Sequence, residues 1–498
     1  MEEAGNGRLG RSGLIVAISI GLALFFDHIF WDHIPGIGFT LFVVAIVAAY
    51  LGIVYYSKKS IHTDLLWLFP LLIFFASMVA IRANLLLTAL NVLGCVLLLL
   101  LSAEVSVRGS VRQFVPWDYF KLLFPFKFIY PLFQAITDVL SIRKDGKESK
   151  KRTQIVRGIF ITVPVLILFA MLFASADPIF ENYVSVLFNW HFEEEHVVRA
   201  IIVFVVAIGL AASYAYALTA VKEESGGGEG TKRGVSHIET GILLGSVNAL
   251  FLTFLLVQLT YLFGGASNIT TEGLTYAEYA RRGFFELIAI AVFSYLILAG
   301  VEKYIERDSG GHSQQFKLLS SALVAQIVII MLSAFSRLSL YEEAFGFTTL
   351  RLYSHAFIIF LGVVFCFLLY KILVEHKDNT FAFRTFLAAV VFVAAMNIFN
   401  PDAFIARKNV ERYEATGKLD AHYLVGLSAD ATAITIRALQ LHDLDIRGTV
   451  GRALYERYYD RNSASAEWPS WNVSRYQETI LLEKHADELL LYKNYESE

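Results

Sequence analysis

The chain has 498 residues, of which 56% are hydrophobic and 17% are charged, with a net charge of -3 and a mean hydropathy of +0.55. About a quarter of the residues of an ordinary soluble domain are charged, so this composition excludes a soluble enzyme or a DNA-binding protein. The near-neutral charge gives no basic field, and we expect no nucleic-acid partner. Both cysteines, Cys95 and Cys366, fall in apolar runs, which predicts packing residues rather than a disulfide.

Apolar runs long enough to cross the hydrocarbon layer of a membrane recur through most of the chain. Helices are predicted because a lone strand in lipid leaves its backbone N–H and C=O groups unpaired. We therefore expect an all-α polytopic transmembrane helix bundle with about eleven spans and a small helical C-terminal soluble domain. The predicted spans are 13–30, 36–56, 65–81, 85–105, 155–176, 197–220, 238–263, 284–302, 317–336, 352–371 and 381–399.

Changes in composition divide the chain further. Residues 222–236 are rich in Gly and Glu, which predicts a flexible linker, and charged residues become frequent after Asn400. The predicted segments are a cytoplasmic N-terminus (1–12), four transmembrane helices (13–105), a basic cytoplasmic segment (106–154), two transmembrane helices (155–221), the linker (222–236), five transmembrane helices (237–400) and a helical soluble tail (401–498).

The positions of Lys and Arg predict the orientation, because short cytoplasmic loops carry an excess of positive charge. With the N-terminus in the cytoplasm, the inner segments hold far more Lys and Arg than the outer ones. An odd number of spans then places the tail outside the cytoplasm. The Phe-rich stretch 114–136 contains Asp118 and three prolines, so we expect an interfacial or re-entrant segment instead of a further span.

Two local patterns predict helices in the tail. Ser428, followed by Asp430, is typical of a helix N-cap with an acidic residue in the first turn. Residues 478–492 carry apolar positions at helical spacing, which predicts one final helix.

The second half of the chain contains several distinctive polar and aromatic segments. They are LTYAEYARRGFFEL (274–287), LYEEAFGFTTLRLYSH (340–355), NPDAFIARKN (400–409), LDAHYL (419–424), LSAD (427–430) and WPSWN (468–472). These segments resemble a family of bacterial polytopic membrane proteins classified as a domain of unknown function. The resemblance implies a location in the bacterial cell envelope, and it implies no activity.

These segments fall at one membrane face in the predicted topology and bring charged residues with them. Glu278, Arg282 and Glu286 share one helical stripe by their spacing, and Arg351 and His355 share another. Ionisable groups near the hydrocarbon boundary are costly unless they are paired or hydrated. One interpretation is an interfacial ion-pair network that fixes helix register, with members Arg281, Arg282, Arg337, Glu342, Glu343 and Arg351.

The other interpretation is an outward-facing cavity for a polar or anionic ligand, with arginine clamping the anion. Its predicted ligand-binding residues are Glu278, Arg282, Glu286, Arg337, Glu343, Arg351 and His355.

A weaker candidate is a metal site at the end of the first span, formed by Asp27, His28, Asp32 and His33. Acidic residues in a first outer loop also resemble the layout of glycosyltransferases that use polyprenyl-phosphate sugars, which is an analogy of architecture only. Polar residues within spans, such as Asn91 and Asn248, predict hydrogen bonds between helices. The sequence contains no cofactor motif, so we predict no cofactor.

The leading hypothesis is a non-enzymatic protein of the bacterial cytoplasmic membrane that binds or senses a ligand, or supports a partner complex, through the charged outer face. The alternative is a membrane enzyme or transporter for a lipid-linked or small polar substrate. The expected partners are membrane lipids, together with an envelope protein or a small polar ligand.

Overall fold

The computed structural model describes residues 2–58, 60–122, 314–375, 377–463 and 467–495, with isolated helical positions between 203 and 302. Within these ranges every regular element is a helix. The chain divides into two compact units. The first comprises Met1–Ala76, Gly94–Ser110 and Lys121–Glu224, and the second comprises Ser77–Leu93, Val111–Phe120 and Ser225–Glu498.

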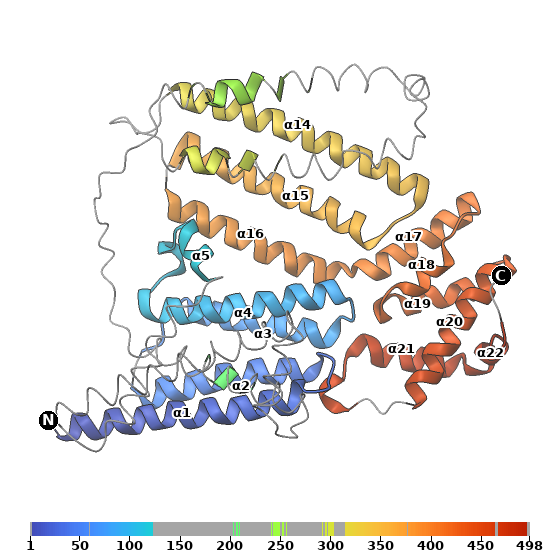
Figure 1. Cartoon of the computed structure of the whole chain (residues 1–498), viewed down its shortest axis with the longest axis horizontal. Coiled ribbons are helices and arrows are strands. Elements are labelled where there is room, and N and C mark those ends of the chain that lie inside the picture. The colour runs from blue at the N-terminus through green and yellow to red at the C-terminus, as the bar shows by residue number, and fades with distance from the viewer. Residues whose placement is uncertain are drawn as a thin grey trace, which may run out of the picture. The chain divides into compact units, whose positions relative to one another are not determined.

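In the first unit, α1 (Glu2–Phe30) and α2 (Ile37–Tyr56) lie side by side (Figure 1). Their contact is aromatic, because the ring of Phe42 on α2 meets Phe26 and Phe30 edge-on at 5.5 and 5.6 Å between centroids. Polar groups tie the neighbouring helices to α2: Thr40 donates to the carbonyl of Ala76 at 2.8 Å. The unit also includes α3 (Leu65–Ile81) up to Ala76 and α4 (Leu85–Arg108) from Gly94, and Ala103 of α4 is buried in the same core as α1 and α2.

Six helices among the described residues are long and apolar enough to cross a membrane. Each of them coincides with a predicted span, and the predicted span 65–81 forms a shorter apolar helix, α3. The spans predicted at 155–176, and nearly all of 197–220, lie outside the described residues, and only parts of 238–263 and 284–302 are described, so the count of eleven stays a prediction. The six helices are Gly13–Phe30, Ile37–Tyr56, Leu85–Arg108, Gln314–Phe345, Thr349–Glu375 and Asp378–Phe399.

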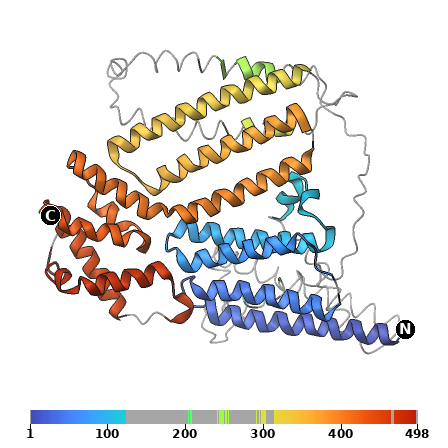
Figure 2. The same ribbon diagram turned by 180° about the vertical axis from the view of Figure 1, so that it is seen from behind.

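The second unit is built on α14 (Gln314–Phe345), α15 (Thr349–Tyr370) and α16 (Asp378–Phe399), which run side by side in both ribbon views (Figures 1 and 2). Leu323, Ile327 and Phe365 are buried in the core between α14 and α15. A π-helical turn, η4 (Lys371–Glu375), follows α15. There the buried ammonium of Lys371 pairs with the carboxylates of Glu302 and Asp378, which satisfies a charge that burial alone would make costly.

The first part of the predicted interfacial stretch is described. A short 3-10 turn, η1 (Val111–Gln113), leads into α5 (Pro116–Leu122), whose Tyr119 ring stacks on Phe386 of α16 at 5.5 Å. Burial and the charge of Asp118 raise the pKa of the Tyr119 phenol above its usual range. Residues 123–136 lie outside the described residues, so the interfacial assignment of the whole stretch stays a prediction.

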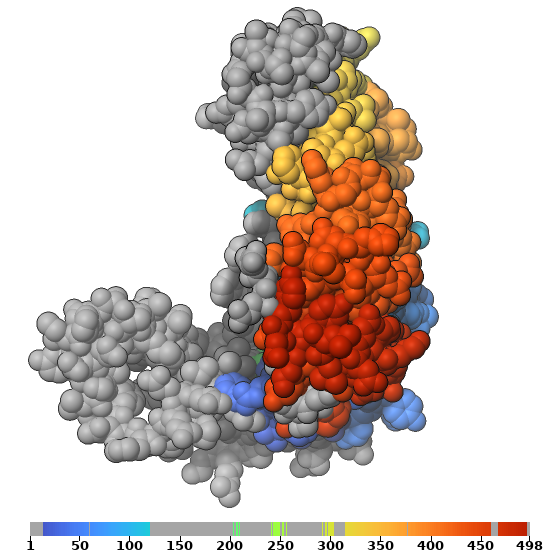
Figure 3. All heavy atoms as spheres, turned by 90° about the vertical axis from the view of Figure 1, so that its right-hand side faces the viewer, coloured from blue at the N-terminus to red at the C-terminus, as the bar shows by residue number. Residues whose placement is uncertain are grey.

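The tail helices gather at one end of α14–α16, and in Figure 3 they occupy, in orange to red, the side of the second unit that faces the viewer. They share a hydrophobic core that includes Leu424, Leu454 and Leu482. Because the tail belongs to the same compact unit as α14–α16, its status as a separate soluble domain stays a prediction. The elements are α17 (Pro401–Thr416), α18 (Ala421–Gly426), η5 (Ala429–Ala431), α19 (Thr432–Thr435), η6 (Ile436–Gln440), α20 (Leu444–Ser463), η7 (Trp468–Ser470), α21 (Val473–Lys484) and α22 (Ala486–Leu490).

Two details of the tail differ from the sequence-based expectation. Ser428 is the N-cap residue of the short η5, but its side chain makes no capping hydrogen bond and instead donates to Asp430. The single helix expected over 478–492 is interrupted at His485, whose φ of -106° and ψ of 13° leave the helical region. The backbone N–H of His485 bonds the carbonyl of Leu482, a tighter pairing that ends α21.

Candidate functional site

The predicted ligand-binding residues divide into two groups. Glu278, Arg282 and Glu286 lie outside the described residues. Arg337 and Glu343 lie on α14, and Arg351 and His355 lie on α15. Because α14 and α15 pack against each other, the shared helical stripe of Arg351 and His355 faces α14, as the spacing predicts.

His355 has a carboxylate partner on the neighbouring helix. Its Nδ1 lies 3.2 Å from Oε2 of Glu342, which is buried, and its Nε2 lies 3.2 Å from the carbonyl oxygen of Phe335. The imidazole ring also packs on the ring of Phe335 at 4.2 Å between centroids. The partner of His355 is therefore Glu342, whereas the side chain of Glu343, one residue further on, is exposed.

Arg351 lies where α14 turns into α15. Its guanidinium donates to the carbonyl of Gly346 and lies over the ring of Tyr341 at 4.0 Å. Gly346 has a φ of +82°, and a Cβ atom there would come within 2.7 Å of Oδ1 of Asn409. The positive φ favours glycine, and any larger residue would also displace the side chain of Asn409, which lines the same small space as Arg351.

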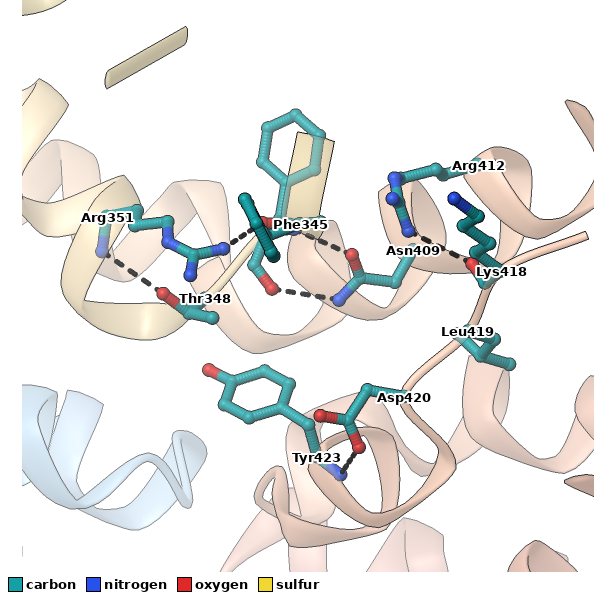
Figure 4. A pocket seen from close by; sticks show the side chains of 11 residues that line it. Phe345, Thr348, Arg351, Asn409, Arg412, Lys418, Leu419, Asp420 and Tyr423 are labelled. Atoms are coloured by element: carbon teal, nitrogen blue, oxygen red, sulfur yellow. Dashed lines mark hydrogen bonds between the residues drawn. The ribbon is translucent and has the colours of Figure 1, made fainter. Parts of the chain in front are cut away.

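That space is a cavity of about 190 Å³ between the α14–α15 turn and the segment that joins α17 to α18 (Figure 4). Its walls are fixed by side chains that bond backbone groups. Asn409 accepts from the N–H of Phe347 at 2.7 Å and donates to its carbonyl at 2.9 Å, and the hydroxyl of Tyr423 accepts from the N–H of Thr349 at 2.7 Å. The lining residues are Phe345, Gly346, Phe347, Thr348, Arg351, Asn409, Arg412, Lys418, Leu419, Asp420 and Tyr423.

Three cationic side chains and one carboxylate line this cavity. Arg412 donates to the carbonyls of Glu343 and Ala344 at 3.0 and 2.6 Å, which satisfies acceptors at the C-terminal end of α14. The carboxylate of Asp420 caps α18 by accepting from the N–H of Tyr423. Lys418 is exposed at the opposite side of the cavity from Arg351 (Figure 4). The excess of positive charge favours an anion.

A second polar constellation, which sequence reasoning missed, surrounds the turn between α3 and α4. One carboxylate oxygen of Asp430 accepts from the backbone N–H groups of Ala83 and Asn84 at 2.7 and 3.0 Å, and the other lies 3.7 Å from the guanidinium of Arg82. The buried amide of Asn84 donates to Asp402 at 2.8 Å. Its oxygen accepts from the N–H of Leu87 in the first turn of α4.

The same turn is held from the start of α21. The side-chain amide of Asn472 donates to the carbonyls of Val79 and Arg82 at 3.0 and 2.9 Å. The hydroxyl of Ser474 lies 2.8 Å from the carbonyl oxygen of Ile81 and 2.6 Å from Oδ1 of Asp430. These bonds satisfy carbonyls that the end of α3 leaves without helical partners. We call Asn84, Asp402, Asp430, Asn472 and Ser474 the polar anchor.

The polar anchor brings together several segments that are far apart in the chain. NPDAFIARKN supplies Asp402, LSAD supplies Asp430 and WPSWN supplies Asn472. LYEEAFGFTTLRLYSH reaches it through the hydroxyl of Tyr353, 3.4 Å from Oδ1 of Asn84. A local signal that could have marked this turn is Asn84, an N-cap type of residue that precedes the apolar run of α4.

The metal prediction receives no support from the structure. Among the described residues, which include Asp27, His28, Asp32 and His33, no group of three or more His, Cys, Asp or Glu is placed to hold a metal ion. His28 and Asp32 are exposed.

The six long apolar helices among the described residues define a polytopic α-helical membrane protein. The chain belongs to a family described as a domain of unknown function, DUF4153, whose model matches residues 69–438. Nothing matches the chain among the curated proteins or among the solved structures. The matched region contains all eleven residues that line the cavity, and the resemblance to a family of this kind is confirmed.

Proposed function

We propose that this membrane protein binds a small anionic ligand in the cavity between the α14–α15 turn and the α17–α18 segment. The observation that carries the proposal is the lining itself, in which Arg351, Arg412 and Lys418 face a cavity with the single carboxylate of Asp420. Drug-sized ligands occupy pockets of about 300 Å³ or more. At about 190 Å³, this cavity fits a phosphate or a carboxylate group with a few attached atoms.

The donors around the cavity suit such a group. A guanidinium has five N–H groups, and the carbonyl of Gly346 takes only one of those of Arg351. Lys418 adds a point charge on a flexible stem. The hydroxyl of Tyr423 and the fixed amide of Asn409 limit the space between these charges. The guanidinium of Arg412 already donates to backbone carbonyls, so it would attract an anion mainly through its positive charge.

The proposal includes a location. Following the Lys and Arg distribution, the protein resides in the bacterial cytoplasmic membrane with eleven spans and a cytoplasmic N-terminus. The cavity and the tail then face the extracytoplasmic side, where the protein binds or senses its ligand, or supports an envelope complex. The cavity belongs to the turn between two span-length helices, α14 and α15, which supports a site at a membrane face.

One observation favours the alternative of a membrane enzyme or transporter. The pair of His355 and Glu342 lies one helical turn from Arg351, and such a pair is a candidate for proton transfer. His355→Gln separates the roles. If the protein only binds its ligand, this variant keeps both the ligand affinity and the cellular phenotype of the wild type. If the protein is an enzyme or transporter, the variant keeps the affinity and loses the phenotype.

The binding proposal is tested on the full chain reconstituted in nanodiscs. Inorganic phosphate is the probe, and the thermal midpoint of unfolding is compared with that in chloride at equal ionic strength. A ligand that binds the folded state raises the midpoint by mass action. We expect Lys418→Gln to reduce the phosphate-induced rise by at least half. Lys408→Gln is the matched control, because Lys408 lies on α17 outside the cavity and pairs with Glu411 at 2.7 Å.

Two results contradict the proposal. One is an equal phosphate-induced rise in the wild type and both variants, which shows binding elsewhere. The other is the absence of any rise with phosphate, acetate or citrate.

A further inference from the structure

The ends of several membrane helices mark one level of the second unit. α3 ends at Ile81, α4 begins at Leu85 and α16 ends at Phe399. The guanidinium of Arg82 joins them, since it donates to the carbonyl of Asn397 at 2.7 Å. Leu85 and Ile398 are 84% and 70% exposed, as expected of side chains that face lipid. The boundary between hydrocarbon and headgroups therefore passes close to this level.

The start of α21 is tied to the same level. Asn472 and Ser474 bond the last carbonyls of α3, as described for the polar anchor. Residues adjacent to Asn472 are therefore held within a few ångströms of the ends of the membrane helices. The depth of this part of the tail is fixed by hydrogen bonds to buried groups.

Exposed aromatic side chains cluster at this place. Trp471 and Tyr476 are 42% and 54% exposed, with ring centroids 6.1 Å apart, and Trp468 is also exposed. Ile480 lies one turn beyond Tyr476 on α21 and is exposed as well. The opposite face of the helix is buried through Ser474, Glu478 and Leu482. An amphipathic helix whose outward face bears aromatic and aliphatic side chains is typical of a membrane-surface segment.

We propose that residues 468–480, the interfacial segment, lie in the headgroup layer of the membrane. Trp and Tyr concentrate at that depth because their rings are apolar while their N–H and O–H groups remain hydrated. Lys484, exposed on α21 beyond the segment, is suited to phosphate groups of lipids. The partner of this surface is lipid, because the surface continues through Arg82 to the exposed ends of the membrane helices.

The inference is independent of the anion-binding proposal and is tested by fluorescence depth measurement. In a full chain that keeps Trp471 as its single tryptophan, Trp31, Trp67, Trp117, Trp190 and Trp468 are replaced by Phe. The protein is reconstituted in phosphatidylcholine and phosphatidylglycerol vesicles. Lipids spin-labelled close to the headgroup are expected to quench Trp471 about twofold or more above lipids labelled at the chain end. Aqueous iodide is expected to quench it weakly.

A matched control uses Leu491, which is 80% exposed at the end of α22, beyond the end of α21 that lies away from Trp471 (Figure 1). In this control all six natural tryptophans are replaced by Phe and Leu491→Trp supplies the single tryptophan. Its fluorescence is expected to be quenched by iodide and unaffected by labelled lipid. If Trp471 responds as Leu491→Trp does, the segment is in water and the inference is wrong. If neither quencher reaches Trp471, protein covers it, which also overturns the inference.

A second measurement keeps the inference testable if the single-tryptophan chain does not fold. The lipid-quenched fraction of the wild-type fluorescence is compared with that of Trp471→Phe alone. A lower fraction in the variant supports the headgroup location, and an unchanged or higher fraction contradicts it.

Discussion

Asp430 holds several partners with one buried carboxylate. Its side chain is 1% exposed, yet one oxygen accepts from the N–H groups of Ala83 and Asn84, and the other meets Ser474 and Arg82. Burial of a charge is unfavourable unless such bonds replace water. All of these groups are donors, so each carboxylate oxygen has partners that replace water.

We predict that Asp430→Asn lowers the free energy of unfolding by about 1–3 kcal/mol. The new amide NH2 must replace one of the two carboxylate oxygens, so either the backbone N–H groups of Ala83 and Asn84 or the guanidinium of Arg82 lose their acceptor. The measurement is the thermal midpoint of the full chain in nanodiscs. Glu414→Gln is the control, because Glu414 is exposed on α17 and the change is also from carboxylate to amide. Equal midpoints for the two variants would show that Asp430 does not hold the turn.

The sequence around Asp430 predicts local structure but not the distant partners of its side chain. The sequence correctly marks Ser428 and Asp430 as the beginning of a helical segment. It misses the partner, because Ala83 is 347 residues away along the chain and no periodicity joins the two. The predicted Arg351 lines the cavity, whereas Asn409, Lys418 and Tyr423 were not singled out, since single polar residues on short helices carry no pattern.

At the scale of elements, a pair of buried amides joins α4 to α16. Asn91 donates to Asn397 at 2.8 Å and accepts from it at 2.7 Å. The prediction that Asn91 bonds a neighbouring helix is confirmed. Asn248 likewise donates to the carbonyl of Leu319 on α14 at 3.1 Å. In lipid such amides are matched across helices because water cannot replace the partner.

A double-mutant cycle on Asn91→Ala and Asn397→Ala is expected to give a coupling free energy of about 0.6–1.7 kcal/mol, the range for hydrogen bonds between membrane helices. Reversible unfolding in mixed micelles supplies the four stabilities. Strictly additive effects would mean that the two amides do not stabilise each other.

The breaks in the helices were less predictable than the helices themselves. The π-helical turn after α15 coincides with Lys371, which reaches Glu302 and Asp378 at once. His485 ends α21 through its own backbone bond and its Nδ1, which lies 2.9 Å from the carbonyl oxygen of Leu481. Both breaks depend on contacts made when the helices pack. The periodic spacing of apolar residues in the sequence therefore does not predict them.

At the scale of the whole molecule, the number of crossings decides which compartment receives the tail. The predicted topology, with eleven spans and a cytoplasmic N-terminus, would place residue 498 outside the cytoplasm. We predict that alkaline phosphatase fused after Glu498 is active in a bacterial host, and that a green fluorescent protein fused there is dark. Fusions at residue 58, in a predicted inner loop, are expected to show the reverse and serve as the control. A fluorescent C-terminal fusion would mean an even number of crossings.

The sequence by itself determined the class of protein and the positions of the described membrane helices. A membrane helix makes all of its backbone hydrogen bonds within one continuous segment. Its apolar side chains are therefore visible as an uninterrupted run in the sequence. Only the tertiary structure decided that Asp402, Asp430 and Asn472 meet at the turn after α3, and that Arg351 shares a cavity with Lys418. These groups come together through the packing of distant segments, and the pairing of a polar group is specified by the neighbours it reaches in space.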